Sequence, residues 1–265
     1  GRIHQDIICP VDDKGCMTKE AGEFIEGKTT WEAEGPCISE LAHAGMLLGK
    51  KSIHHQYAHC WRCKNPVIYR ATEQWFASIN DFREKALEAV DNTTFIPSWG
   101  HDRLYNMVRD RQDWCISRQR SWGVPIPAFY CDDCGKYVIT PETIGKVKDV
   151  VAKEGSDAWW SYPAEQLLPE NFKCPHCGGT HFHKETDIMD VWFDSGSTWN
   201  GVLKDPHENW KKDGAEYPCD LYLEGSDQHR GWFQSSLLTS VAVNGKAPYK
   251  AVLTHGFTMD GEGRK

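Results

Sequence analysis

The sequence predicts an α/β fold built on a parallel sheet, and three neighbouring segments carry this prediction. Residues 221–223 form a short apolar stretch that is typical of a strand. Residues 226–243 have the apolar spacing of a helix, and a second strand is expected over 250–257. A strand, a helix and a strand in this order form a βαβ crossover, which joins two parallel strands of one sheet.

The expected helix over 226–243 has the clearest sequence signals. Ser226 can cap its first turn, and the carboxylate of Asp227 favours the positive N-terminal end. Apolar residues recur at helical spacing further along, at Phe233, Leu237, Leu238 and Val241. A helix that begins at Ser226 would place Trp232, eight residues after Glu224, about two turns along.

Shorter elements are expected along the rest of the chain. A turn is expected over 10–15, and Pro125-Ile126-Pro127 interrupts regular structure before the cysteine-rich segment. Asp81 is a candidate N-cap for the second helix. We predict strands over 67–70 and 74–79, and helices over 38–48, 81–90, 101–111 and 142–154.

Composition limits the classes of protein that fit. The 265 residues, of which 40% are hydrophobic and 12% aromatic, suffice for about two packed domains. The formal net charge of −8 argues against a polycation that binds nucleic acid by charge alone. No apolar run approaches the ~18 residues of a membrane span, and no secretory leader opens the chain. We therefore expect a cytoplasmic protein, for which eleven cysteines indicate metal ligation and no disulfide framework.

Two Cys-x-x-Cys pairs predict a structural zinc site. Cys131 with Cys134 and Cys174 with Cys177 offer four thiolates, the ligand set of a closed tetrahedral zinc site. Glycines follow both pairs, at Gly135 and at Gly178-Gly179, and allow the tight turns that aim amides at the sulfurs. The alternative is that these are buried or redox-active cysteines.

A third pair, Cys60 and Cys63, has no partner pair in the sequence. Histidines flank it at positions 54, 55 and 59. One hypothesis is that the pair is half of a second zinc site. The other is that both are packed or exposed thiols, and a site that uses the nearby histidines is a weaker third possibility.

A polar string follows the expected strand over 221–223. In an α/β sheet, ligands bind beyond the carboxyl ends of the strands. Glu224 stands at such an end and can accept hydrogen bonds from an ammonium or a ribose hydroxyl, while Gly225 permits close approach of a ligand. Asp227 and Gln228 add further acceptors and a donor. The alternative is a capped helix with solvated polar side chains.

Several strings, taken together and in order, closely resemble class I isoleucyl-tRNA synthetases over essentially the whole chain. Segments 192–197 and 225–232 resemble the isoleucine branch more than the valine or leucine branches. The strings are His59-Cys60-Trp61-Arg62, Tyr69-Arg70-Ala71-Thr72-Glu73-Gln74-Trp75-Phe76, Asp113-Trp114-Cys115-Ile116-Ser117-Arg118-Gln119-Arg120-Ser121-Trp122-Gly123, Asp190-Val191-Trp192-Phe193-Asp194-Ser195-Gly196-Ser197, Gly225-Ser226-Asp227-Gln228-His229-Arg230-Gly231-Trp232, His255-Gly256-Phe257 and Gly263-Arg264-Lys265.

The resemblance implies a Rossmann-like nucleotide-binding sheet with a zinc-ribbon-like insertion and a β-rich remnant of an editing domain. It implies an enzyme that joins L-isoleucine to ATP, with Mg²⁺, as an adenylate, transfers it to tRNA(Ile) and edits mischarged valine. A monomeric parent protein is expected. The implied parts are 1–66, the tail of the editing insertion with a linker; 67–130, a catalytic-domain segment; 131–183, the zinc-binding excursion; and 184–265, the second half of the catalytic domain.

The resemblance also implies particular site residues. Trp192 and Trp232 match the positions that wall the isoleucine side chain, and flat aromatic faces suit a branched aliphatic group. The alternative is that both are core aromatics. The residues expected to bind the substrate or the adenylate are Glu224, Gly225, Asp227, Gln228, Trp192, Trp232 and His255. Such a pocket rejects valine only weakly, because one methylene is worth ~1–3 kcal/mol.

Other family signatures are absent or incomplete, so we expect the chain to be a fragment that is inactive alone. The His-Ile-Gly-His string and the editing pocket's Gly-His-Gly string do not occur, and a Lys-Met-Ser-Lys-Ser string would begin at Lys265. Arginines 109, 111, 118 and 120 could contact a tRNA acceptor end, or form ion pairs that orient the zinc excursion. The alternative functions are a free-standing zinc-ribbon module that binds RNA or protein, and a valine- or leucine-specific sister synthetase.

Overall fold

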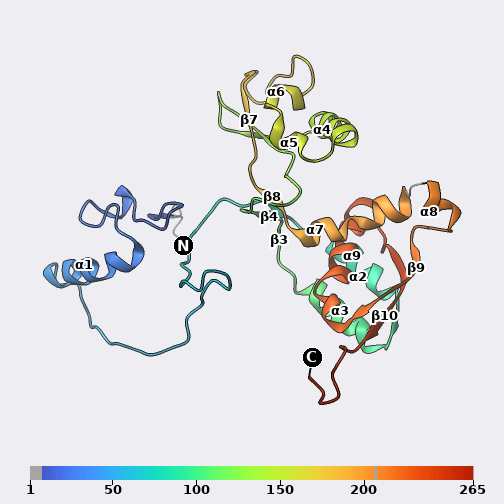
Figure 1. Ribbon diagram of the computed structural model, residues 1–265, viewed down its shortest axis with the longest axis horizontal. Coiled ribbons are helices and arrows are strands. Elements are labelled where there is room, and N and C mark those ends of the chain that lie inside the picture. Colours follow the sequence, from blue (N-terminus) through green and yellow to red (C-terminus); the bar gives the residue numbers. More distant parts are fainter. Residues whose placement is uncertain (1–7, 206–207, 265) are drawn as a thin grey trace. The chain divides into compact units, whose positions relative to one another are not determined.

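The computed structural model describes residues 8–205 and 208–264 (Figure 1). The chain divides into two compact units, Gly1–Glu73 and Gln74–Lys265. Within the described ranges, no helix is both long enough and apolar enough to cross a bilayer. The finer division at 66/67, 130/131 and 183/184 stays a prediction.

The first unit is built from a turn, a 3-10 helix η1 (Lys19–Ala21) and the helix α1 (Thr30–His43). The expected turn is confirmed, because the amide of Gly15 donates to Asp12 O at 3.1 Å. The expected helix over 38–48 is misplaced. Thr29 and Glu32 form a reciprocal capping box that starts α1 at Thr30, ahead of the apolar periodicity. The expected strand over 67–70 does not form.

A three-stranded parallel sheet forms the centre of the second unit, as the sequence predicts. Its strands are β2 (Thr94–Ile96), β10 (Tyr249–His255) and β9 (Cys219–Gly225), in the order β2-β10-β9. Both pairings with β10 are parallel. The helix α9 (Trp232–Asn244) joins β9 to β10, so the predicted βαβ crossover is confirmed (Figure 1).

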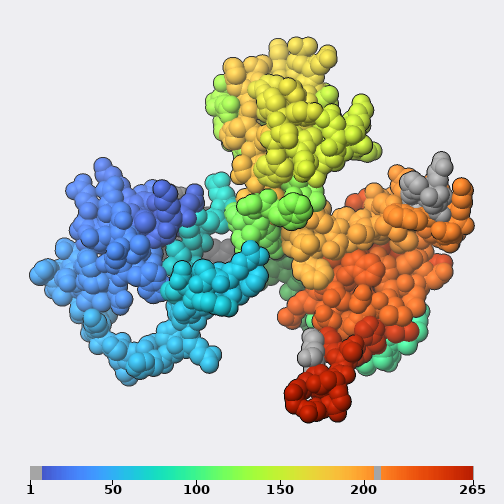
Figure 2. All heavy atoms as spheres, viewed as in Figure 1, coloured from blue at the N-terminus to red at the C-terminus, as the bar shows by residue number. Residues whose placement is uncertain are grey.

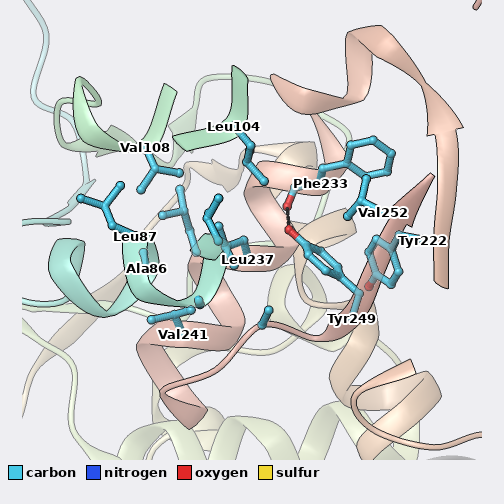
Figure 3. Packing of buried hydrophobic residues seen from close by; sticks show 14 of the residues in the cluster. Ala86, Leu87, Leu104, Val108, Tyr222, Phe233, Leu237, Val241, Tyr249 and Val252 are labelled. Carbon is cyan, nitrogen blue, oxygen red and sulfur yellow. Dashed lines mark hydrogen bonds between the residues drawn. The ribbon is translucent and has the colours of Figure 1, made fainter. Parts of the chain in front are cut away.

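Helices α2 (Arg83–Asp91) and α3 (Trp99–Arg109) pack with α9 and the sheet around the main hydrophobic core (Figure 3). The phenol of Tyr249 donates to Phe233 O at 2.9 Å and ties β10 to α9. Both helices lie near their expected ranges, but Phe82 occupies the N-cap of α2, so the expected cap at Asp81 is wrong. The core residues drawn and labelled are Ala86, Leu87, Leu104, Val108, Tyr222, Phe233, Leu237, Val241, Tyr249 and Val252.

The cysteine-rich segment packs around a second core of its own (yellow and green in Figure 2). Trp159 and Phe129 are fully buried within it, with ring centroids 5.2 Å apart. The helix α4 confirms the expectation over 142–154. The elements are the antiparallel strands β5 (Phe129–Cys131), β6 (Tyr137–Val138) and β7 (Phe182–Lys184), and the helices α4 (Pro141–Glu154), α5 (Ala158–Ser161) and α6 (Ala164–Leu167).

Short strands join the cysteine-rich segment to the parallel sheet. Glu185 is buried, and its carboxylate accepts from the indole of Trp75 at 2.8 Å and the phenol of Tyr130 at 2.7 Å. The expected strand over 74–79 shrinks to two residues. The elements here are β1 (Phe76–Ala77), β3 (Trp114–Cys115), β4 (Ser117–Arg118), β8 (Ile188–Met189), α7 (Val191–Gly196), the π-helix η2 (Asn200–Lys204) and α8 (Glu208–Lys212).

Candidate functional site

The polar string lies at the carboxyl end of β9, where the sequence predicts it. Glu224 is exposed, and it shares a face of β9 with Tyr222 because side chains alternate along a strand. Gly225 is buried and pairs with His255 of β10. A Cβ on Gly225 would lie 2.8 Å from Asp227 Oδ1 and 3.8 Å from His255 Cε1. The structure therefore places these residues together at one end of the sheet. The group that approaches Gly225 closely is the side chain of Asp227, where the sequence predicts a ligand.

The helix after the strand begins later than expected. Residues Ser226–His229 form a 3-10 turn, η3, and α9 starts at Trp232. The expected cap at Ser226 is wrong, because the side-chain carbonyl of Gln228 accepts from the Trp232 amide at 2.9 Å. The Gln228 amide group donates to Asp227 Oδ2 at 3.2 Å. Trp232 is thus the first residue of the helix and lies next to the polar turn.

Each of the two tryptophans contacts the segment that carries the other. The indole of Trp232 stacks on Tyr222, with centroids 3.9 Å apart and planes at 10°, and its Nε1 donates to Ser195 O of α7 at 3.1 Å. The indole of Trp192, on α7, lies against Gly231 just before α9, where a Cβ would come within 2.9 Å of Trp192 Cζ3. Trp192 remains 42% exposed. The structure brings the predicted pair together, with one ring partly buried and the other open to solvent.

Asp190 fixes the start of α7 and was missed as a site residue. Its carboxylate, 5% exposed, accepts from the Trp192 amide at 3.3 Å and from Trp114 Nε1 at 3.0 Å. It also pairs with Arg118 at 3.0 Å. An aspartate before the apolar run Val191-Trp192-Phe193 is an N-cap signal that could have identified this role.

Two further titratable groups lie beside these residues. Burial, with the nearby charge of Asp190, raises the pKa of Asp194 to about 6. His229 is fully buried beneath the polar turn, where its Nδ1 lies 3.0 Å from Ser226 O. Burial lowers the pKa of His229, so the ring is neutral at pH 7 and its Nδ1–H can donate to Ser226 O.

A cleft of about 400 Å³ adjoins Trp192 and is lined by Arg111, Arg118, Arg230 and Gln234. Arg111 donates to Gln234 Oε1 at 2.5 Å and lies over the ring of Trp114 at 5.2 Å. Two of the predicted arginines form ion pairs, Arg109 with Asp110 and Arg118 with Asp190. These contacts favour the ion-pair alternative for both, and a tRNA contact stays a prediction.

Cys131, Cys134, Cys174 and Cys177 converge as predicted, with all four sulfurs within 4.8 Å of one another. The Cys131–Cys177 and Cys134–Cys174 sulfurs are 3.5 and 3.8 Å apart. Ligands around tetrahedral zinc, at Zn–S distances near 2.3 Å, stand about 3.8 Å apart. Burial acts to raise the pKa of Cys174, but hydrogen bonds from the backbone amides of His176 and Cys177 and from the neighbouring thiols together outweigh burial and lower that pKa to about 7.

The glycines that follow the two Cys-x-x-Cys pairs adopt the predicted tight-turn conformation, with positive φ of +70° at Gly135 and +77° at Gly178. All eleven cysteines are free. Within the described ranges, Cys60 and Cys63 join no group of three or more candidate metal ligands. The Nδ1 atom of His59 instead lies 2.6 Å from Lys64 O. A second zinc half-site at this pair stays a prediction. Lys265, where a Lys-Met-Ser-Lys-Ser string would begin, lies outside the described residues.

Comparison with known proteins places the chain in a family. The family model described as tRNA synthetases class I (I, L, M and V) matches residues 12–265. The isoleucine–tRNA ligase of Caldicellulosiruptor bescii is 59% identical over 264 residues, which cover 100% of this chain and 28% of that protein. That of Carboxydothermus hydrogenoformans is 59% identical over 259 residues, 98% of this chain and 28% of that protein. The chain thus spans about 28% of the length of these relatives, and it belongs to the class I tRNA synthetases of the isoleucine, leucine, methionine and valine group.

Proposed function

We propose that the chain is the part of an isoleucine–tRNA ligase that holds the amino-acid side chain and one end of the adenylate. The observation that carries this proposal is the placement of two tryptophans beside the polar turn after β9: Trp232 is hydrogen-bonded to α7, and Trp192 of α7 lies against Gly231 at the start of α9. The 59% identity with isoleucine–tRNA ligases supports isoleucine over valine or leucine as the substrate. The whole protein would join L-isoleucine to ATP and transfer it to tRNA(Ile).

The chemistry of the site suits an aminoacyl adenylate. The exposed carboxylate of Glu224 can accept charge-assisted hydrogen bonds from the ammonium or a ribose hydroxyl, each worth about 1.5–3 kcal/mol. The exposed side chains of Asp227 and His255 stand at the same sheet end. The indole faces exclude water from the aliphatic side chain. These residues bind and orient, while ATP with Mg²⁺ would supply the activated phosphate.

The four-cysteine cluster fits a structural zinc ion. The spacing of the sulfurs matches a closed thiolate site, as do the backbone amides of His176 and Gly179, which donate to the sulfurs of Cys174 and Cys177. Such a site leaves no coordination position on the metal for a substrate. A bound zinc would link Cys131 and Cys134 to Cys174 and Cys177 and hold together the small core around Trp159. A free-standing zinc-ribbon module is less favoured, because such a module requires neither the parallel sheet nor the paired tryptophans.

The remaining partners follow from the same proposal. We infer that the parent protein is a cytoplasmic monomer that binds tRNA(Ile) and edits mischarged valine in another domain. The 265-residue chain alone is expected to make no adenylate, because its sequence lacks the His-Ile-Gly-His string. Isoleucine-dependent exchange of pyrophosphate into ATP by the pure chain, above a blank without enzyme, would refute that expectation.

Pyrophosphate exchange by the full-length protein tests the proposed function. The assay compares isoleucine, valine, leucine and methionine as substrates. We expect isoleucine to have the highest kcat/KM. Trp192→Ala should raise the KM for isoleucine about 10–100-fold, because an aromatic wall is lost. Trp160→Ala, an exposed tryptophan of the cysteine-rich segment, is the matched control and should leave the KM unchanged. Preference for another amino acid, or an equal effect of both variants, would contradict the proposal.

A further inference from the structure

The backbone of α7 lies unusually close to α9 at one point. A Cβ on Gly196 would lie 2.8 Å from both the carbonyl carbon and the carbonyl oxygen of Ser235. These are backbone atoms of a helix, so they cannot rotate away as a flexible side chain could. Gly196 is buried, and its own carbonyl oxygen lies 2.6 Å from Thr239 Oγ1. Glycine at 196 therefore sets how close the two helices can come.

This contact lies next to the attachment of Trp232. Ser195, whose carbonyl oxygen holds the Trp232 indole, immediately precedes Gly196 on α7. At the other attachment, Gly231 leaves room for the indole of Trp192 and the side chain of Gln228; a Cβ there would come within 2.9 and 2.5 Å of them. Any change in the spacing of α7 and α9 must therefore move one indole relative to the other.

We propose that Gly196 and Gly231 are positioning residues that set amino-acid specificity by fixing the separation of the Trp192 and Trp232 indoles. The inference rests on the proposed function, because it assigns these rings to the amino-acid pocket. Neither glycine contacts the substrate in this account. Gly196 acts by keeping α7 and α9 at a distance that no larger residue permits, and Gly231 acts by leaving the space that the Trp192 indole occupies at the start of α9.

The principal test is Gly196→Ala in the full-length protein. The added methyl must move α7 away from α9, so the KM for isoleucine should rise at least 5-fold in pyrophosphate exchange. The preference for isoleucine over valine, as a ratio of kcat/KM, should fall at least 3-fold. The KM for ATP should stay within 2-fold. Gly201→Ala is the matched control, because a Cβ there meets no atom within 4 Å, and it should change none of these values.

A purely structural role would give a different result. Partial unfolding lowers kcat for every substrate in proportion and leaves each KM and the isoleucine/valine ratio unchanged. If Gly196→Ala yields too little folded protein, Thr239→Val and Thr239→Ser replace it. The valine variant removes the hydroxyl beside Gly196 O and should lower the ratio, while the serine variant keeps the hydroxyl and should restore it.

Two outcomes separate this inference from the proposed function. If the unaltered protein activates isoleucine and Trp192→Ala changes its selectivity, but Gly196→Ala and Thr239→Val do not, the inference is wrong and the proposed function stands. If the unaltered protein does not activate isoleucine, the proposed function itself fails.

Discussion

The indole nitrogen of Trp232 donates a hydrogen bond to the carbonyl oxygen of Ser195 at 3.1 Å. This bond fastens the first residue of α9 to the helix that carries Trp192. The stacking of Trp232 on Tyr222 holds the same ring from the side of the sheet. The ring thus has two fixed neighbours on two different elements, which defines its orientation before any ligand arrives.

Replacing Trp232 with phenylalanine separates the hydrogen bond from the aromatic surface. Trp232→Phe keeps a ring that can stack on Tyr222 but removes the indole N–H that donates to Ser195 O, which keeps the Thr198 hydroxyl as a donor. We expect the KM for isoleucine to rise about 5–10-fold, which corresponds to a loss of ~1–1.4 kcal/mol for one neutral hydrogen bond. Steady-state pyrophosphate exchange measures this, and a variant with unaltered KM would show that the bond does not orient the ring.

Asp190 should stabilise the region around α7 measurably. Asp190→Ala leaves the buried indole N–H of Trp114 and the Trp192 amide without an acceptor, which costs about 1–3 kcal/mol. Asp190→Asn keeps a carbonyl acceptor and should cost less. Hydrogen exchange of peptides over residues 188–199 measures the free energy of local opening. Equal protection in Asp190→Ala and the unaltered protein would contradict this role.

Asp194 should titrate near neutral pH. Burial and the charge of Asp190 raise its pKa to about 6 from 3.8. The folded state therefore holds this proton more tightly than the unfolded state, and its contribution to stability is lost as pH rises from about 4 to 6. The free energy of unfolding of Asp194→Asn should therefore exceed that of the unaltered chain above pH 6, where the Asp194 carboxylate is charged. Below pH 4 the substitution should give no such gain.

Carbon-13 NMR of labelled aspartate carboxyls measures this pKa directly. Asp194→Asn assigns the signal by its disappearance. Asp190→Asn should lower the midpoint, because a like charge is removed, but keep it above 3.8, because burial remains. A midpoint at or below 3.8 in the unaltered chain would contradict the environment described for Asp194.

The cysteine cluster should bind one zinc ion per chain. Elemental analysis after expression with zinc should find it, and Cys174→Ser should lose it. Cys37→Ser, which alters a cysteine of α1 outside the cluster, is the matched control. Chelation should remove hydrogen-exchange protection from α4 but leave β9 and β10 protected, because the metal contributes folding energy only to its own module. Full zinc retention in Cys174→Ser would refute the site.

Sequence patterns identified the elements whose signals are local. The βαβ unit was predictable because apolar spacing over 233–241 and two flanking apolar strands fall within forty residues. The four-cysteine cluster was predictable because its signals are local, namely the two Cys-x-x-Cys pairs and the glycine that follows each of them. The family resemblance, and not periodicity, singled out Trp192 and Trp232 among twelve tryptophans.

The missed features depend on specific contacts that residue composition and apolar spacing do not reveal. Ser226 has the composition of a helix cap, but the side chain of Gln228 takes that role, and α9 starts six residues later. The strand expected over 74–79 is confined to Phe76–Ala77, which pairs with β3, and no strand forms over 67–70. Nothing in local sequence shows that Gly196 meets Ser235, thirty-nine residues away, because that contact exists only once α7 and α9 have packed.

The most direct test of the central claim, that the end of β9 and the paired tryptophans bind isoleucyl adenylate, is Glu224→Gln in the full-length protein. Glutamine keeps the shape but loses the charge, which is worth about 1.5–3 kcal/mol, or roughly 10–100-fold in kcat/KM for isoleucine activation. Hydrolysis of premade valyl-tRNA should be unchanged, because in the proposed function editing takes place in another domain. Normal isoleucine activation by Glu224→Gln, together with normal activation by Trp232→Ala, would show that the polar string is only a turn and that the site lies elsewhere.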